Sequence, residues 1–220
     1  MEIAPYVALA LITLVTTAGN YLWPDRRSRI HRAVASRRRV MVHDAHGTVR
    51  LTGRVRRIGD LLRAPLTGRR CVAYEVVVDE PGAGGWCRCV ELREVRPFMV
   101  VDESGEARID SSGPFLMSLR YHRTGNTSAF SIFPGVHEDL ASLLATAGVV
   151  STSWFGRWKR FRYGEAVLEE GGLVSVSAGS VLEVDPAGER VNQRSPPERL
   201  VLRGTEALPL LISDERGSHP

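Results

Sequence analysis

The feature that most constrains this chain is a run of nineteen uncharged residues near its start, from Pro5 to Trp23. At 1.5 Å per residue, a helix of this length spans about 30 Å, the thickness of the hydrocarbon core of a bilayer. Tyr21 and Trp23 lie at the end of the run, where aromatic rings often meet the headgroups. The run therefore predicts a transmembrane helix over 5–23, preceded by a short extracytoplasmic segment, 1–4.

A cleaved signal peptide and a buried core helix are the alternative interpretations of this run. A signal peptide begins with basic residues and ends at a small-x-small cleavage site. Here Glu2 is the only charge before the run, and no convincing site of that kind follows it. These observations favour a retained anchor, so we expect the rest of the chain to be tethered to a membrane.

Directly after the run, residues 24–39 form an arginine-rich juxtamembrane segment whose only acid is Asp25. Its seven arginines are Arg26, Arg27, Arg29, Arg32, Arg37, Arg38 and Arg39. Positive flanks remain in the cytoplasm, which predicts an outside N-terminus and a cytoplasmic domain. The same side chains are expected to contact anionic lipid headgroups, and a specific lipid or nucleic-acid site is the sharper alternative.

The charge of the remaining chain is nearly balanced. Without this segment and Glu2, the sequence holds 22 basic and 23 acidic residues, although the whole chain has a net charge of +4. A nucleic-acid-binding face needs cations clustered on the folded body. We therefore expect a membrane bilayer and an unidentified protein as partners, and no nucleic acid.

Three cysteines, Cys71, Cys87 and Cys89, fit a reducing compartment better than a disulfide scaffold. Cys87 and Cys89 would share a strand face with Glu91, and Cys71 could face them from a paired strand. Three thiolates with a histidine could hold zinc, but small buried cysteines are common in cores. We predict no metal, no cofactor and no catalytic residue.

Beyond residue 40 the apolar residues mostly recur with a period of two, which is typical of half-buried strands. Strands are predicted over 48–55, 71–78, 86–95, 161–168, 173–178 and 200–203, with a hairpin turn at 102–105. One helix is predicted over 136–147, with Leu140, Leu143, Leu144 and Ala147 as its apolar stripe and Gly148 as its C-cap. The expected fold is a transmembrane helix plus a mainly β, barrel-like domain over 40–213 with one inserted helix, ending in a flexible tail, 214–220.

The most unusual composition in the body is the aromatic and basic segment 154–163. Its candidate partner-binding or membrane-binding residues are Trp154, Phe155, Arg157, Trp158, Lys159, Arg160 and Arg162. The segment could be a strand beside the bilayer, a partner surface, or an amphipathic strand packing its rings on the helix. The glycine-rich hairpin tip 81–86 is the second candidate surface.

A series of short segments, in this order, resembles the GIDE or BAM ("beside a membrane") domain family. The segments are LTGRV at 51–55, APLTGRRCVAYE at 64–75, PFMVVDESG at 97–105, ARID at 107–110 and RYGEAVLEEG at 162–171. The resemblance implies a relationship to membrane-anchored RING ubiquitin ligases, in which a C-terminal RING supplies the ligase activity. A RING is held together by zinc ligands, and this chain has no cysteine after residue 90 to supply them. The relatives also have a second transmembrane helix, but the last apolar stretch of this chain, 207–212, is too short to span a bilayer.

Together these patterns predict a membrane-anchored recognition or scaffolding module without ligase activity of its own, which binds a protein or lipid partner beside the bilayer. The alternative is a membrane-tethered hydrolase or transferase, including the ubiquitin-ligase-like role that the resemblance implies, whose active site the sequence does not reveal. A concave pocket lined by titrating groups with shifted pKa values would favour the enzyme.

Overall fold

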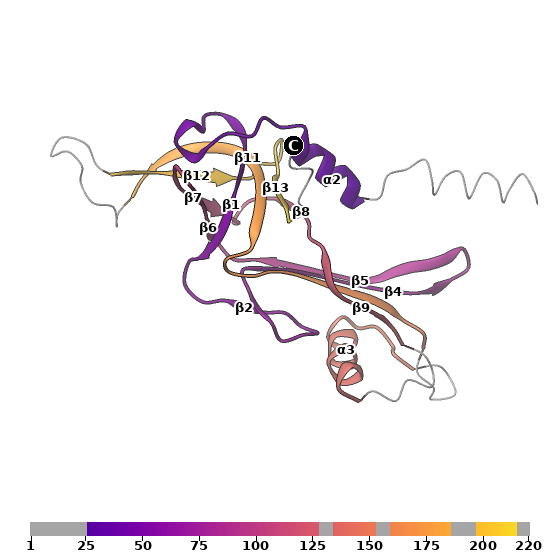
Figure 1. Cartoon of the computed structure of the whole chain (residues 1–220). Coiled ribbons are helices and arrows are strands. Elements are labelled where there is room, and N and C mark those ends of the chain that lie inside the picture. The colour runs from indigo at the N-terminus through magenta and orange to yellow at the C-terminus, as the bar shows by residue number, and fades with distance from the viewer. Residues whose placement is uncertain (1–25, 128–133, 153–158, 186–196, 215–220) are drawn as a thin grey trace, which may run out of the picture.

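The computed structural model of this chain describes residues 26–127, 134–152, 159–185 and 197–214 (Figure 1). In this part of the chain the protein is mainly β, as predicted, with two α-helices, α2 (Arg26–Ala35) and α3 (Pro134–Thr146), and a short 3-10 helix, η1 (Val42–Asp44). The predicted transmembrane helix, 5–23, lies outside the described residues. Among those that are described, no helix is both long and apolar enough to cross a membrane.

Five strands of the described chain close into a barrel. In order of pairing they are β1 (Thr48–Arg57), β6 (Phe98–Asp102), β7 (Gly105–Asp110), β12 (Glu198–Arg203) and β11 (Leu173–Val184), and β11 pairs again with β1. Val49, Leu51 and Val55 of β1 point into the barrel core, as their spacing predicts. At Gly53 a side chain would collide with the backbone of Val101 in β6, so glycine permits this close strand crossing.

Two further strands extend the barrel sheet. They are β13 (Leu210–Ser213), which pairs with β11, and β8 (Phe115–Ser118), which pairs with β13. Helix α2 lies over them and buries Ile30 and Val34 against Leu211. This helix is absent from the predicted elements, because the surrounding arginines obscure an apolar stripe of only two residues, one turn apart.

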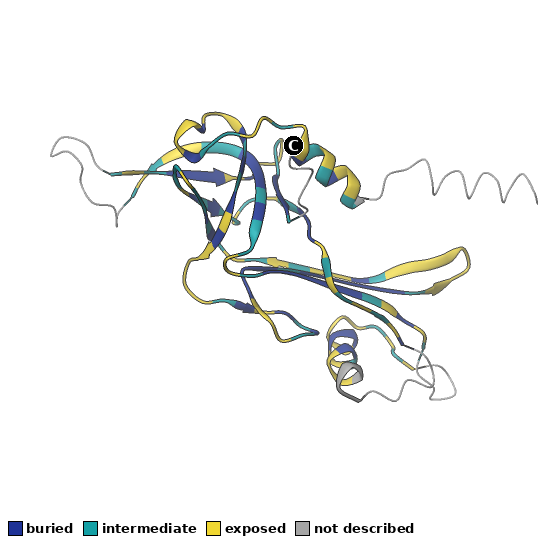
Figure 2. Ribbon diagram, in the orientation of Figure 1, coloured by how far each residue is buried: buried dark blue, intermediate teal, exposed yellow. Residues whose placement is uncertain are grey.

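A separate four-stranded antiparallel sheet forms the second layer of the molecule. Its order is β5 (Gly85–Val95), β4 (Ala73–Gly82), β10 (Arg162–Leu168) and β9 (Tyr121–Asn126). Helix α3 covers one face together with the small hairpin of β2 (Leu62–Arg63) and β3 (Arg70–Cys71). Figure 2 shows the buried side of α3 turned toward this sheet.

The position of α3 agrees with the predicted helix over 136–147 to within a turn. Leu140, Leu143 and Leu144 are buried as expected. Ala147 is exposed, in contrast to the prediction, because the helix ends at Thr146. Gly148 has a φ of +71°, and the Val149 N–H donates to the Leu144 carbonyl at 2.8 Å, so the glycine closes the helix as predicted.

Candidate binding surface on the four-stranded sheet

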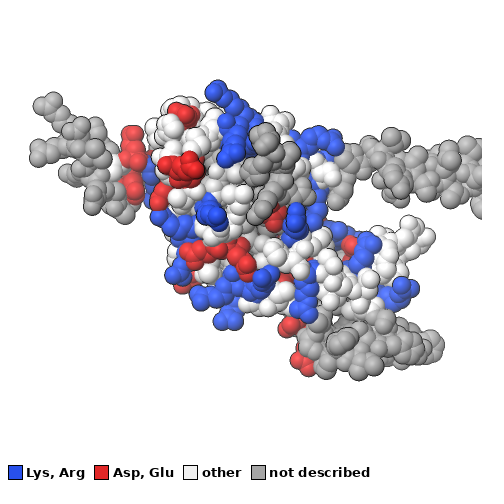
Figure 3. Space-filling view, viewed as in Figure 1, with Lys and Arg blue, Asp and Glu red and all other residues white. Residues whose placement is uncertain are grey.

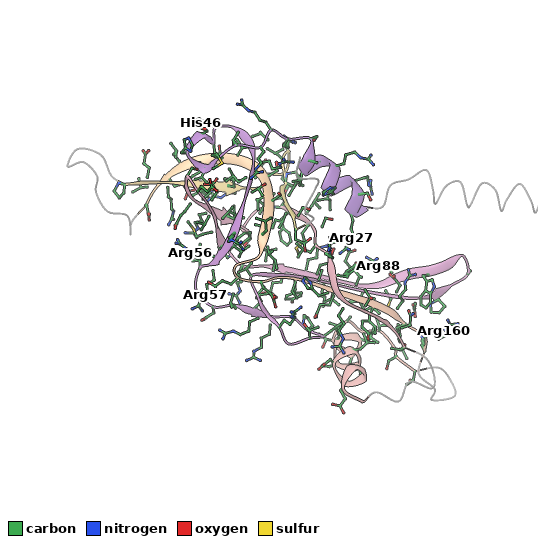
Figure 4. All side chains as sticks on the ribbon, in the orientation of Figure 1. Arg27, His46, Arg56, Arg57, Arg88 and Arg160 are labelled. Atoms are coloured by element: carbon green, nitrogen blue, oxygen red, sulfur yellow. The ribbon has the colours of Figure 1, made fainter. Side chains whose placement is uncertain are left out.

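The face of the four-stranded sheet that α3 leaves uncovered carries charged side chains. In β4, Val76 and Val78 point toward α3, so that Glu75, Val77 and Asp79 point to the other face. This face and Arg27 of α2 line a groove of about 460 Å³, which we call the polar groove. Its charged residues are Arg27, Glu75, Asp79, Arg88, Glu91, Arg93 and Arg162. Figure 4 shows Arg27, Arg88 and Arg160 following one another toward the far end of the sheet.

Glu75 ties helix α2 to the sheet. Its carboxylate is buried and accepts hydrogen bonds from Arg27 Nη2 at 2.9 Å and from Arg93 Nε at 2.8 Å. Arg27 also donates to the carbonyl of Leu119, and its guanidinium lies 3.5 Å from the centroid of the Tyr121 ring. Two charge-assisted bonds offset the cost of removing the carboxylate from water.

The arginines of the juxtamembrane segment therefore differ in where they lie. Arg27 belongs to the set that the sequence predicts at the lipid headgroups, but in the structure its guanidinium is bound to Glu75 within the domain. Arg29, Arg32, Arg38 and Arg39 are exposed and Arg37 is half-buried, whereas the side chain of Arg26 lies outside the described part. A contact with lipid remains a prediction for the whole set.

Farther along the polar groove, Asp79 of β4 connects its own strand to β5 and β10. It accepts hydrogen bonds from Arg88 Nε at 2.6 Å and from Arg162 Nη2 at 3.2 Å. The pairing of β4 with β5 shifts between Val78 and Asp79, where Cys89 bulges out of register. The bulge places Arg88 and Glu91 on the same face, so the predicted shared face for Cys87, Cys89 and Glu91 is wrong.

At the hairpin end of the sheet, the two surfaces predicted separately from the sequence meet. Trp86 is 37% exposed, and the centroid of its ring lies 5.1 Å from the Arg162 guanidinium and 5.9 Å from that of Arg160. Lys159 Nζ lies 3.7 Å from a Glu80 oxygen. We call these five residues the tryptophan end. Arg160 is exposed and makes no ion pair with another described residue.

In the described part of segment 154–163, the side chains of residues 160–162 alternate between the surface and the core. Phe161 is fully buried against Leu140 and Leu144 of α3, while Arg160 and Arg162 point outward. This is the arrangement of an amphipathic strand that also presents cations. Trp154, Phe155, Arg157 and Trp158 lie outside the described residues.

The tryptophan end lies on the side of the molecule from which the chain enters α2. In Figure 1 the start of α2 and the tip of the β4–β5 hairpin point the same way, and the β11–β12 hairpin points the opposite way.

The three cysteines do not gather as the alternative of a zinc site would require. Cys71 precedes Ala73, which pairs with Val95 at one end of the β4–β5 ladder, whereas Cys87 pairs with Glu80 near the other end. Burial, followed by the charge of Glu165, raises the pKa of the Cys71 thiol to about 12, so this thiol is a poor nucleophile near neutral pH. Burial also raises the pKa of Cys89. Within the described ranges, no three metal-binding side chains gather.

A buried polar cluster was not singled out by the sequence reasoning. Glu165 of β10 is fully buried, and its Oε1 accepts a hydrogen bond from the Leu66 N–H at 2.6 Å. Arg123 of β9 donates to the Leu66 carbonyl at 3.0 Å. The two side chains hold the turn at 64–68 against the sheet. A glutamate followed directly by the apolar run Ala166-Val167-Leu168 is the signal that could have revealed it.

Comparison with protein-family profiles, with curated proteins and with solved structures gave no match to this chain. The resemblance to the GIDE or BAM domain therefore remains a prediction, and the geometry alone carries the functional argument. On the face that Figure 3 presents, positive and negative side chains are intermingled. This surface agrees with the nearly balanced charge of the body.

Proposed function

We propose that this chain is a membrane-anchored recognition module of GIDE or BAM type, which holds its β domain beside the bilayer with the tryptophan end against the headgroups. In this arrangement residues 5–23 cross the membrane, the N-terminus lies outside and the domain lies in the cytoplasm. The observation that carries the proposal is the exposed Trp86 between Arg160 and Arg162, on the side where α2 begins. Aromatic rings and arginines are the residue types that favour the bilayer interface.

The polar groove supports binding and orientation more than catalysis. It is a concave site lined by titrating groups, which is the feature expected of the alternative enzyme. However, Arg27 and Arg93 engage Glu75, while Arg88 and Arg162 engage Asp79. Carboxylates held between guanidiniums on neighbouring elements fix α2 and the hairpin in place, and a recognition module needs such a fixed geometry.

The contact with the bilayer can be measured through Cys87, which is exposed and adjoins Trp86. The full chain, labelled at Cys87 with a fluorophore, is placed in bilayer nanodiscs that contain phosphatidylserine and lipids with a nitroxide quencher on the headgroup. We expect strong quenching of this label. The matched control carries Cys87→Ser and Val181→Cys, which moves the label to the exposed β11–β12 hairpin on the opposite side, and we expect little quenching there.

The double variant Trp86→Ala, Arg160→Ala should reduce quenching at Cys87, and so should replacing phosphatidylserine with phosphatidylcholine. Neither residue is buried, so the melting temperature should change little. The proposed orientation would be contradicted by equal quenching at both label positions, or by quenching at Cys87 that is the same in the double variant as in the wild type.

A further inference from the structure

A second surface lies along the barrel, on the side away from the tryptophan end. A shallow depression of about 660 Å³ is lined there by the apolar side chains of Ile58, Met99 and Leu182 and by four arginines, Arg56, Arg57, Arg108 and Arg199. Figure 4 shows His46, Arg56 and Arg57 along this side, with Arg88 and Arg160 on the other. We call this depression the barrel groove.

The barrel groove exposes more aliphatic surface than a solvated strand requires. Ile58 is 37% exposed and Leu182 is 56% exposed. Val184, two positions after Leu182 on β11 and on the same strand face, lies beyond the lining of the groove and is also more than half exposed. Single exposed aliphatic side chains are ordinary, but a group of them rimmed by charges is typical of an interaction site.

Arg108 is the unusual cation of this groove. The other three arginines each contact an acid: Arg56 contacts Glu106, Arg57 contacts Glu170 and Arg199 contacts Asp185. Arg108 is half-buried, its Nε is removed from solvent, and it has no hydrogen bond or ion pair with any described residue. A buried guanidinium N–H without an acceptor is costly, and a carboxylate can satisfy it by accepting two parallel hydrogen bonds from the Nε and a terminal nitrogen.

We propose that the barrel groove binds a short acidic segment of a protein partner. An aspartate or glutamate of the segment pairs with Arg108, and aliphatic side chains beside it contact Leu182 and Ile58. A lipid surface is disfavoured because the groove lies away from the start of α2 (Figure 1). A nucleic acid is disfavoured because it needs several free cations, whereas Arg56, Arg57 and Arg199 already contact acids. This inference deepens the proposed recognition role by naming the class of partner.

A library of random short peptides, displayed and selected against the full chain in nanodiscs, tests the proposal directly. Selected peptides should be enriched in Asp or Glu next to Leu, Ile or Val. Synthetic copies, measured by fluorescence anisotropy, should bind the Arg108→Gln variant at least about tenfold more weakly, the loss of one charged contact. Arg63→Gln, which removes an exposed arginine of the β2–β3 hairpin, is the matched control and should leave binding unchanged.

Leu182→Ser is a second variant that keeps the test decisive if Arg108→Gln fails to fold, and it should weaken binding as well. The proposal would be overturned if the selected peptides are not enriched in acidic residues, or if they bind both variants as tightly as the wild type. Competition by an RNA oligonucleotide would overturn it in favour of a nucleic acid. Self-association that depends on Arg108 would identify a second copy as the occupant. Peptide binding tests the barrel groove, and headgroup quenching tests the orientation at the bilayer. A negative result in one experiment therefore does not contradict the proposal that the other tests.

Discussion

Glu165 shows how a single polar residue can organise the core of this domain. Its side chain is fully buried in β10, one oxygen bonds the Leu66 N–H, and the other has no partner among the described residues. Replacing Glu165 with alanine leaves that N–H without an acceptor and opens a cavity. We expect Glu165→Ala to lower the free energy of unfolding by about 2–4 kcal/mol, measured by denaturant titration of the full chain in detergent.

Glu165→Gln keeps both the volume and an acceptor oxygen, so it should cost only about 1 kcal/mol. Glu170→Ala is the surface control, since Glu170 is exposed and pairs with Arg57 over 3.5 Å, and it should change stability by less than about 0.5 kcal/mol. If Glu165→Ala lowers the free energy of unfolding no more than this control does, the turn at 64–68 does not depend on the carboxylate.

At the scale of elements, Arg27 makes α2 a part of the domain instead of a free linker. Among its described residues the helix fully buries Ile30 and Val34, so at its first turn docking depends on the bond from Arg27 to Glu75 and on the Tyr121 ring. We expect Arg27→Ala to speed hydrogen exchange of the α2 amides by about tenfold, with exchange in β6 and β7 unchanged. Arg29→Ala removes an exposed arginine of the same helix and should leave all exchange rates alone. Equal effects of the two variants would contradict the role assigned to Arg27.

The strands and α3 were predictable because their apolar residues repeat at the spacing of one buried face. Val49 and Leu51 of β1 and Leu140 and Leu144 of α3 lie where that spacing places them. Pairing partners were not predictable, since periodicity defines a face but not the neighbouring strand. The parallel pairs of β12 with β7 and of β13 with β8 are examples.

For the candidate site, sequence reasoning found Trp86 and Arg160 as members of separate segments. Their meeting depends on the β4–β5 and β4–β10 ladders.

At the scale of the whole molecule, two aspartates make stability depend on acid. Desolvation raises the pKa of Asp102, but hydrogen bonds from Ser104, Val42 and Gly105 outweigh it, so the pKa is lowered overall. For Asp110, desolvation is likewise outweighed by Ser112 and Arg203, and its pKa is lowered. Both groups bind protons more weakly in the folded state. Their stabilisation is therefore complete above the ordinary aspartate pKa of about 3.9 and is lost as the pH falls through the lowered values.

The domain should accordingly melt at progressively lower temperatures as the pH drops below about 4. The variant Asp102→Asn, Asp110→Asn should show a flatter dependence of melting temperature on pH. Asp60→Asn, at an exposed position, provides the control and should keep the wild-type slope. A double variant that retains the full slope would show that other carboxylates govern acid unfolding.

The closed barrel also has a consequence for how the chain is made. Thr52 of β1 faces Ser175 of β11, 123 positions later, and their hydroxyl groups lie 2.8 Å apart. The ribosome adds about 5–20 residues per second, so the long edge of β1 waits roughly 6–25 s for its partner to be synthesised. Throughout that interval β1 can pair with β6, but a chain held at a membrane by its N-terminal segment would keep the other edge of this apolar strand unpaired and close to other nascent chains. Late closure therefore leaves this edge of β1 open to wrong pairing with other chains until β11 has been made.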